Sequence, residues 1–209
     1  MTWRVRLAAA LGLALVVAGC ARKAETPKET PVVPPVDAVE TGTPEKTTPA
    51  REEGDGSRLT SEAFKDGEAI PARCTADGED ASPDLAWGSF LPDETKVLAL
   101  IMDDPDAPSG TFTHWVIYDI PTSWTMIEAG TPPQKQLPDS EVKQGKNGFG
   151  SIGYKGPAPP PGKPHHYHFT LYALDAPTGL AAGATRDELT KAMEGHIIAQ
   201  KELVGTYGR

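Results

Sequence analysis

Residues 97–120 read VLALIMDDPDAPSGTFTHWVIYDI, which is two apolar runs joined by an acidic, proline-containing segment. The first run, at 97–102, is apolar at every position, as is typical of an interior strand that is buried on both faces. The second, at 113–120, is rich in β-branched and aromatic residues and is stopped by Pro121. These 24 positions therefore predict two strands joined by a polar turn.

A third strand is predicted at 165–174, HHYHFTLYAL, after a stretch in which proline forbids regular structure. The segments between the three strands are long and dense in Gly, Pro, Asp and Asn. Few helices and long loops predict a mainly β domain. Packing two sheets against each other is the usual way to bury strands that are apolar on both sides.

One helix is expected near the C-terminus. Thr185 and Glu188 have the T-x-x-E spacing of a capping box, which satisfies backbone N–H groups at a helix start. Gly195 lowers the stability of a helix by about 1 kcal/mol relative to Ala, so this helix must depend on packing. Three apolar residues four positions apart supply the predicted packing stripe: Leu189, Met193 and Ile197.

The N-terminus resembles a bacterial lipoprotein signal. Arg4 and Arg6 precede an apolar run at 7–18, which is shorter than the roughly 20 residues that a membrane-spanning helix needs. The run ends in V-A-G-C, which resembles a lipobox with Cys20 as the lipidated residue. We therefore expect residues 1–19 to be a signal peptide and Cys20 to anchor the protein in the cell envelope, with an ordinary secretory peptide as the alternative.

Residues 21–56 contain six prolines, many Thr, Glu and Lys, and no aromatic residue. Such a composition cannot bury enough apolar surface to offset the entropy of the chain. We expect residues 20–56 to comprise the lipidated cysteine and a disordered tether. The remaining residues, 57–209, have the common size of one domain.

The predicted domain is acidic, with 13 Lys and Arg against 21 Asp and Glu. Its basic residues do not cluster, so no nucleic-acid partner is expected, and the link to the membrane should be covalent rather than electrostatic. Cys74 is the only other cysteine. No intramolecular disulfide is therefore expected once Cys20 is lipidated, and Cys74 is predicted to be a small buried residue.

Carboxylates and a histidine are predicted to gather at one end of the sheet. Asp104 and Asp106 follow the first strand directly, within D-P-D-A-P, and His114 opens the second strand. A short connection between two strands places the end of one beside the start of the next. The spacing therefore favours a common location for all three side chains.

The third strand contributes further polar residues. Side chains alternate between the faces of a strand, so His165 and Tyr167 share one face, and His166 and His168 share the other. Histidines donate hydrogen bonds to phosphate or carboxylate oxygens, and a neighbouring Asp fixes the orientation of the ring. These residues leave both a small-anion site and a metal site open.

The order of these segments resembles the phosphatidylethanolamine-binding protein family, particularly its bacterial Raf-kinase-inhibitor-like branch. The resemblance covers nearly all of residues 59–209, whereas the tether and lipobox fall outside it. The matching segments are S-P-D-L-A-W at 82–87, D-D-P-D-A-P at 103–108, H-W-V at 114–116, G-Y-K-G-P at 153–157 with the proline-rich stretch to Gly162, the strand at 165–174 with Asp175, and G-T-Y at 205–207.

This resemblance implies a sandwich of antiparallel sheets with a C-terminal α-helix and long Pro/Gly-rich loops. It also implies a pocket for a phosphorylated head group or another small anion, with no cofactor. The histidines and the tyrosine would donate to the anion, an aspartate would orient a histidine, and a protonated histidine or bridging cation would offset the carboxylates. The residues implied are Asp104, Asp106, His114, His165 and Tyr167, with Gly156 and Pro157 in the rim segment 156–160.

Three functions are open. A membrane-anchored binding protein, which is not an enzyme, is the leading hypothesis. The alternative is inhibition of an envelope or secreted protease through the loops at 121–147. A hydrolase, in which a His/Asp pair activates water, ranks last because the sequence has no nucleophile elbow and no H-E-x-x-H motif.

Overall fold

The computed structural model describes residues 58–88 and 91–209. The predicted signal peptide, Cys20 and the tether lie outside these residues. No helix of the described part is long and apolar enough to cross a membrane. The elements in chain order are η1 (Ala72–Cys74), β1 (Leu85–Ala86), β2 (Val97–Asp104), β3 (Phe112–Pro121), β4 (Met126–Ile127), β5 (Lys143–Gln144), β6 (His165–Leu174), α1 (Arg186–Met193) and β7 (Ile197–Tyr207).

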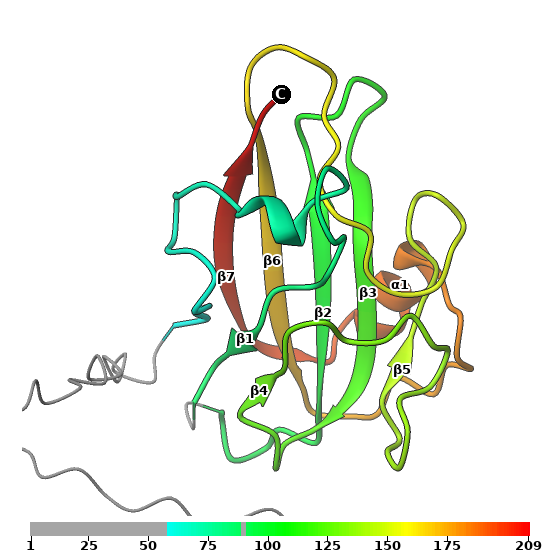
Figure 1. Cartoon of the computed structure of the whole chain (residues 1–209). Coiled ribbons are helices and arrows are strands. Elements are labelled where there is room, and N and C mark those ends of the chain that lie inside the picture. Colours follow the sequence, from blue (N-terminus) through cyan, green and yellow to red (C-terminus); the bar gives the residue numbers. More distant parts are fainter. Residues whose placement is uncertain (1–57, 89–90) are drawn as a thin grey trace, which may run out of the picture. The chain divides into compact units, whose positions relative to one another are not determined.

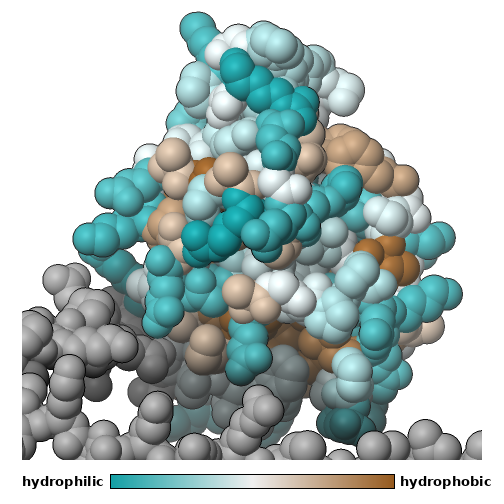
Figure 2. Space-filling view, in the orientation of Figure 1, coloured by the Kyte–Doolittle hydropathy of each residue, from teal (hydrophilic) through white to brown (hydrophobic). Residues whose placement is uncertain are grey.

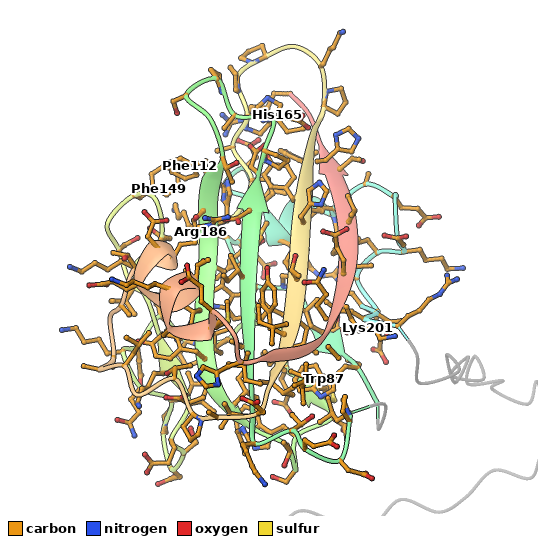
Figure 3. The ribbon with its side chains drawn as sticks, turned by 180° about the vertical axis from the view of Figure 1, so that it is seen from behind. Trp87, Phe112, Phe149, His165, Arg186 and Lys201 are labelled. Atoms are coloured by element: carbon orange, nitrogen blue, oxygen red, sulfur yellow. The ribbon has the colours of Figure 1, made fainter. Side chains whose placement is uncertain are left out.

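Five strands form one antiparallel sheet in the order β5-β3-β2-β6-β7, and β1 pairs with β4 in a second, two-stranded sheet. Figure 1 shows β1, β4 and η1 in front of the large sheet. Seen from behind in Figure 3, α1 covers the opposite face. The fold is thus mainly β and built of antiparallel sheets, as predicted from the sequence.

Strand β2 is buried on both faces, which explains its unbroken apolar run. Leu98, Leu100 and Met102 belong to the larger core, which β1, β4 and the segment preceding β1 cover. Ala99 and Ile101 point the other way and belong to a smaller core beneath α1. Because side chains alternate along the strand, β2 contributes residues to two separate cores.

The helix begins as predicted but is shorter than predicted. Thr185 and Glu188 form the capping box, with Glu188 N–H donating to Thr185 Oγ1 at 3.3 Å and Thr185 N–H donating to Glu188 Oε2 at 2.7 Å. The helix ends at Met193, because Gly195 adopts a φ of +78°. The prediction that Ile197 continues the apolar stripe is wrong, since Ile197 opens β7 and is exposed.

Strand β7 was missed in the sequence. It pairs with β6 from Leu174↔Ile197 to His165↔Tyr207, and so completes the sheet after the helix.

Cys74 is buried at 2% exposure, as predicted, and burial raises the pKa of its thiol. On the face viewed in Figure 2, apolar side chains are scattered among hydrophilic ones.

Candidate functional site

The candidate site lies at the end of the sheet where β2 ends and β3 and β6 begin. Asp104 is the last residue of β2 and pairs with Phe112, the first residue of β3. His165, the first residue of β6, pairs with Tyr207, the last residue of β7. In Figure 1 this is also the end at which the chain finishes. The topology thus brings together residues that are up to 103 positions apart in the sequence.

A β-bulge turns His114 toward the site. The pairing of β3 with β2 passes from Trp115 to Thr113 in a single step, so His114 is the extra residue of the bulge. Strict alternation would place His114 on the face of Val116, which packs beneath α1. Its ring instead meets the ring of Tyr167 edge-on, with centroids 5.2 Å apart.

The imidazole of His114 is held in one tautomer. Its Nδ1 lies 2.6 Å from the carbonyl oxygen of Lys155, which can only accept, so Nδ1 carries the hydrogen. The residue is 4% exposed, and this burial lowers the pKa of His114 despite the opposing effects of the Lys155 carbonyl and Asp104. A neutral His114 therefore leaves Nε2 as a hydrogen-bond acceptor.

His165 forms a buried pair with Asp104. The Nδ1 of His165 lies 2.8 Å from Asp104 Oδ2, and Asp104 Oδ1 accepts from the backbone N–H of Asp106 at 2.9 Å. Both oxygens of Asp104 are thus occupied within the protein. The pair fixes the ring of His165 and leaves its Nε2 for another partner.

Tyr167 lies between the two histidines and has an unusual hydroxyl. Its ring also faces that of His165 at 6.5 Å, with an interplanar angle of 24°. The side chain is fully buried, and its hydroxyl is the single buried side-chain polar atom of the described residues that lacks a hydrogen-bond partner. Burial raises the pKa of Tyr167, with a further contribution from Asp104, so the phenol keeps its proton.

The structure places Asp106 with a different histidine. Asp106 Oδ2 accepts from the backbone N–H of His166 at 2.8 Å and lies 2.7 Å from His166 Nδ1. The hydrogen bonds from His166 lower the pKa of Asp106. His166 lies on the opposite face of β6 from His165, so Asp106 does not join Asp104 in bonding the buried histidine.

The predicted rim segment is fastened to the loop that follows η1. Gly156 N–H donates to Asp80 Oδ1 at 2.6 Å, and Ala76 N–H donates to the carbonyl of Pro157 at 3.0 Å. The other oxygen of Asp80 pairs with Lys155 Nζ. Asp80, which sequence reasoning missed, thereby holds the segment whose Lys155 carbonyl fixes His114.

A second group that the sequence analysis missed lies at the end of β7, where Tyr207 pairs with His165. Arg209 donates two hydrogen bonds to Asp77, of 2.5 Å to Oδ1 and 2.7 Å to Oδ2. Tyr207 donates to the same carboxylate at 2.8 Å. No local motif joins Asp77 to Tyr207 and Arg209, because Asp77 lies 130 and 132 positions before them in the sequence. Among residues 58–88 and 91–209, no group of three or more His, Cys, Asp or Glu side chains is arranged to hold a metal ion.

Comparison with known proteins adds an independent observation. The family model described as phosphatidylethanolamine-binding protein matches residues 60–208. A UPF0098 protein of Methanothermobacter thermautotrophicus is 49% identical over 151 residues, which cover 72% of this chain and 98% of that protein. A second one, from Pyrococcus horikoshii, is 50% identical over 155 residues, covering 73% and 77%.

Two solved structures share the fold. One is a phosphatidylethanolamine-binding protein homologue from Chlamydia trachomatis, with a TM-score of 0.65 and 38% identity, covering 73% of this chain and 97% of that one. The other is Escherichia coli YbcL, described as a new member of the mammalian PEBP family, with a TM-score of 0.68 and 28% identity over 73% and 98%.

Proposed function

Because this chain belongs to the phosphatidylethanolamine-binding protein family, we propose that its site binds a small ligand through a phosphoryl or similar anionic group. The observation that carries the proposal is the buried Tyr167 hydroxyl, which lacks a partner. Leaving a buried polar group unsatisfied costs about 1–3 kcal/mol. A ligand oxygen that accepts from this hydroxyl would recover that free energy.

The two histidines complete the recognition of the anion. His165, oriented by Asp104, offers Nε2 and donates to a ligand oxygen when the ring is protonated. A neutral His114 offers Nε2 as an acceptor, because its Nδ1 hydrogen is used by Lys155. The arrangement favours a phosphate monoester that retains one P–OH, since such a group donates to His114 and accepts from Tyr167. The monoanion, which retains one P–OH, predominates below about pH 6.

Binding is tested by isothermal titration calorimetry of the full chain with inorganic phosphate and phosphoethanolamine. Tyr167→Phe removes only the hydroxyl, and Tyr172→Phe, on the other face of the same strand, is the matched control. We expect Tyr167→Phe to weaken binding about tenfold and Tyr172→Phe to leave it unchanged. Absence of binding to wild type at millimolar concentration, or equal losses in both variants, would overturn the proposal.

The protein is proposed to act by binding and not by turnover. The full chain, incubated with a chromogenic phosphate ester, should release no product above the uncatalysed rate. Release that is abolished by His165→Ala would instead establish a hydrolase in which the Asp104–His165 pair activates water.

We further propose that a lipid on Cys20 anchors this domain to a membrane of the cell envelope. The support is the apolar run and the V-A-G-C segment at the N-terminus of the chain. Metabolic labelling with a clickable fatty acid should mark the wild type and not Cys20→Ser, and the variant should leave the membrane fraction. Equal labelling and equal membrane association of both proteins would contradict the anchor.

A further inference from the structure

Two phenylalanines border the site next to His114. Phe149 is 56% exposed, more than any other large apolar side chain of the described residues, and its ring lies 4.7 Å from that of Phe112. Phe112 in turn lies 5.2 Å from His114, and Phe149 lies 6.3 Å from it. Figure 3 shows both phenylalanines near the end of the sheet that holds His165. Phe112 and Phe149 together are called the aromatic edge below.

The turn that carries Phe149 is firmly built. Asn147 is buried, and its Oδ1 accepts from Phe149 N–H at 3.0 Å, from Ser151 N–H at 3.2 Å and from Ser151 Oγ at 3.0 Å. Its Nδ2 donates to the carbonyl of Gly153 at 3.0 Å. Phe149 is therefore exposed by a turn that one buried side chain organises with four hydrogen bonds.

The same turn is shaped to accommodate Phe112. Gly148 N–H donates to the carbonyl of Thr113 at 2.7 Å, which fixes the turn beside β3. A Cβ atom on Gly148 would lie 2.6 Å from Cζ of Phe112, so any larger residue would collide with the ring. Glycine at this position thus allows Phe112 and Phe149 to meet at the edge of the site.

The charges around His114 favour an apolar rather than a cationic occupant for this edge. Three carboxylates influence the pKa of His114, and all of them are already hydrogen-bonded within the protein. Asp104 is bonded by His165, Asp103 by Thr113 and Arg186, and Asp80 by Lys155 and Gly156. Arg186 and Lys155 balance the charges of Asp103 and Asp80, so a ligand ammonium at the aromatic edge would compete with cations that the protein itself supplies.

We infer that the aromatic edge is a subsite for an aryl or alkyl substituent carried directly on the anionic group of the ligand. The site then has two ends: His165, Tyr167 and His114 bind the anion, and Phe112 and Phe149 cover the apolar substituent. Removing exposed aromatic surface from water supplies the free energy of this second contact. The inference rests on the proposed function, because it assigns the substituent of the ligand that the same site binds.

The test compares inorganic phosphate, phenyl phosphate and phosphocholine as ligands of the full chain. Wild type is measured beside Phe149→Ala, Phe149→Leu and the control Ile197→Ala, which removes another exposed apolar side chain at the opposite end of β7. Leucine retains apolar surface but has no π-face, so Phe149→Leu separates apolar contact from cation–π attraction.

We expect wild type to bind phenyl phosphate about tenfold more tightly than phosphate. Phe149→Ala should remove most of that advantage and leave phosphate binding within twofold, whereas Phe149→Leu and Ile197→Ala should largely retain it. Equal affinity of wild type for phosphate and phenyl phosphate would overturn this inference alone. A preference for phosphocholine that Phe149→Leu abolishes would also overturn it. Failure of all three ligands to bind wild type would overturn the proposed function, and this inference with it.

Discussion

Two neighbouring Asp–His pairs connect the end of β2 and the turn that follows it to β6, yet one pair is buried and the other is exposed. Asp104 pairs with His165 at 2.8 Å, and Asp106 pairs with His166 at 2.7 Å. The side chains of the first pair are 5% and 11% exposed, whereas those of the second are 42% and 56% exposed. The same two residue types, at almost the same separation, therefore build the candidate site on one face and a surface contact on the other.

From this difference we expect burial, rather than residue identity, to decide how much such a pair contributes to stability. A buried pair leaves an uncompensated charge or donor when one partner is lost, whereas an exposed pair is replaced by water. The alternation of β6 determines which histidine enters which environment. The following predictions test this contrast in order of decreasing effect.

Removing the carboxylate from the buried pair should have the largest effect. Asp104→Ala leaves the buried His165 Nδ1–H without its acceptor and frees the backbone N–H of Asp106. We expect the free energy of unfolding to fall by about 3 kcal/mol, measured by urea denaturation at pH 7. A loss as small as that of Asp106→Ala would show that burial does not separate the two pairs.

Tyr167→Phe should weaken phosphate binding and make the unliganded protein more stable. The hydroxyl is buried and unpartnered, so removing it should raise the free energy of unfolding of the unliganded protein by about 1 kcal/mol. Thermal denaturation without and with phosphate measures both the stability and the binding. Without phosphate the variant should unfold at a higher temperature than wild type, and phosphate should raise its unfolding temperature by less. A variant that is less stable than wild type would mean that the hydroxyl already has a partner.

The buried His114 should make the protein less stable in acid. Burial lowers its pKa in the folded state, so the unfolded chain binds the proton more readily below its ordinary pKa of 6.5. Stability is therefore lost as the pH falls through 6.5 toward the folded-state pKa. Between pH 7.5 and 5.5, His114→Gln should lose less unfolding free energy than wild type, with the exposed His166→Gln as the control. Equal slopes for wild type and His114→Gln would refute this.

The exposed pair should give the smallest effect. Asp106→Ala removes a carboxylate that accepts from His166 and is largely open to water. We expect urea denaturation at pH 7 to show a loss of about 0.5 kcal/mol, and 0.5 M salt to reduce it further. A loss of several kcal/mol would show that the exposed pair is as important to the fold as the buried one.

The fold was largely readable from local patterns. The unbroken apolar run of β2, the β-branched run of β3 and the aromatic alternation of β6 were each predicted close to their observed bounds. Strand β7 was missed because Ile197 fits a helical spacing from Met193, and only the positive φ of Gly195 shows that the helix has already ended.

The site was predicted in part, for a physical reason. Alternation alone separates His165 and Tyr167 from His166, and the structure shows that separation. The partner of Asp106 depends on how the turn after β2 folds over β6, which residue spacing does not encode. The exposed Phe149 and the buried Asn147, which organises its turn, lie in the long segment between the strands predicted at 113–120 and 165–174, so the proximity of Phe149 to His114 emerged only from the fold.

The most direct test of the central claim is an NMR titration of the imidazole nitrogens of the full chain with inorganic phosphate. The account predicts that the Nε2 resonances of His114 and His165 shift with saturation, while those of His166 and His168 stay near their starting positions. The account would be contradicted by shifts confined to His166 and His168. It would also be contradicted if no histidine shifted at phosphate concentrations up to about 10 mM, because a dissociation constant above that value means very weak binding.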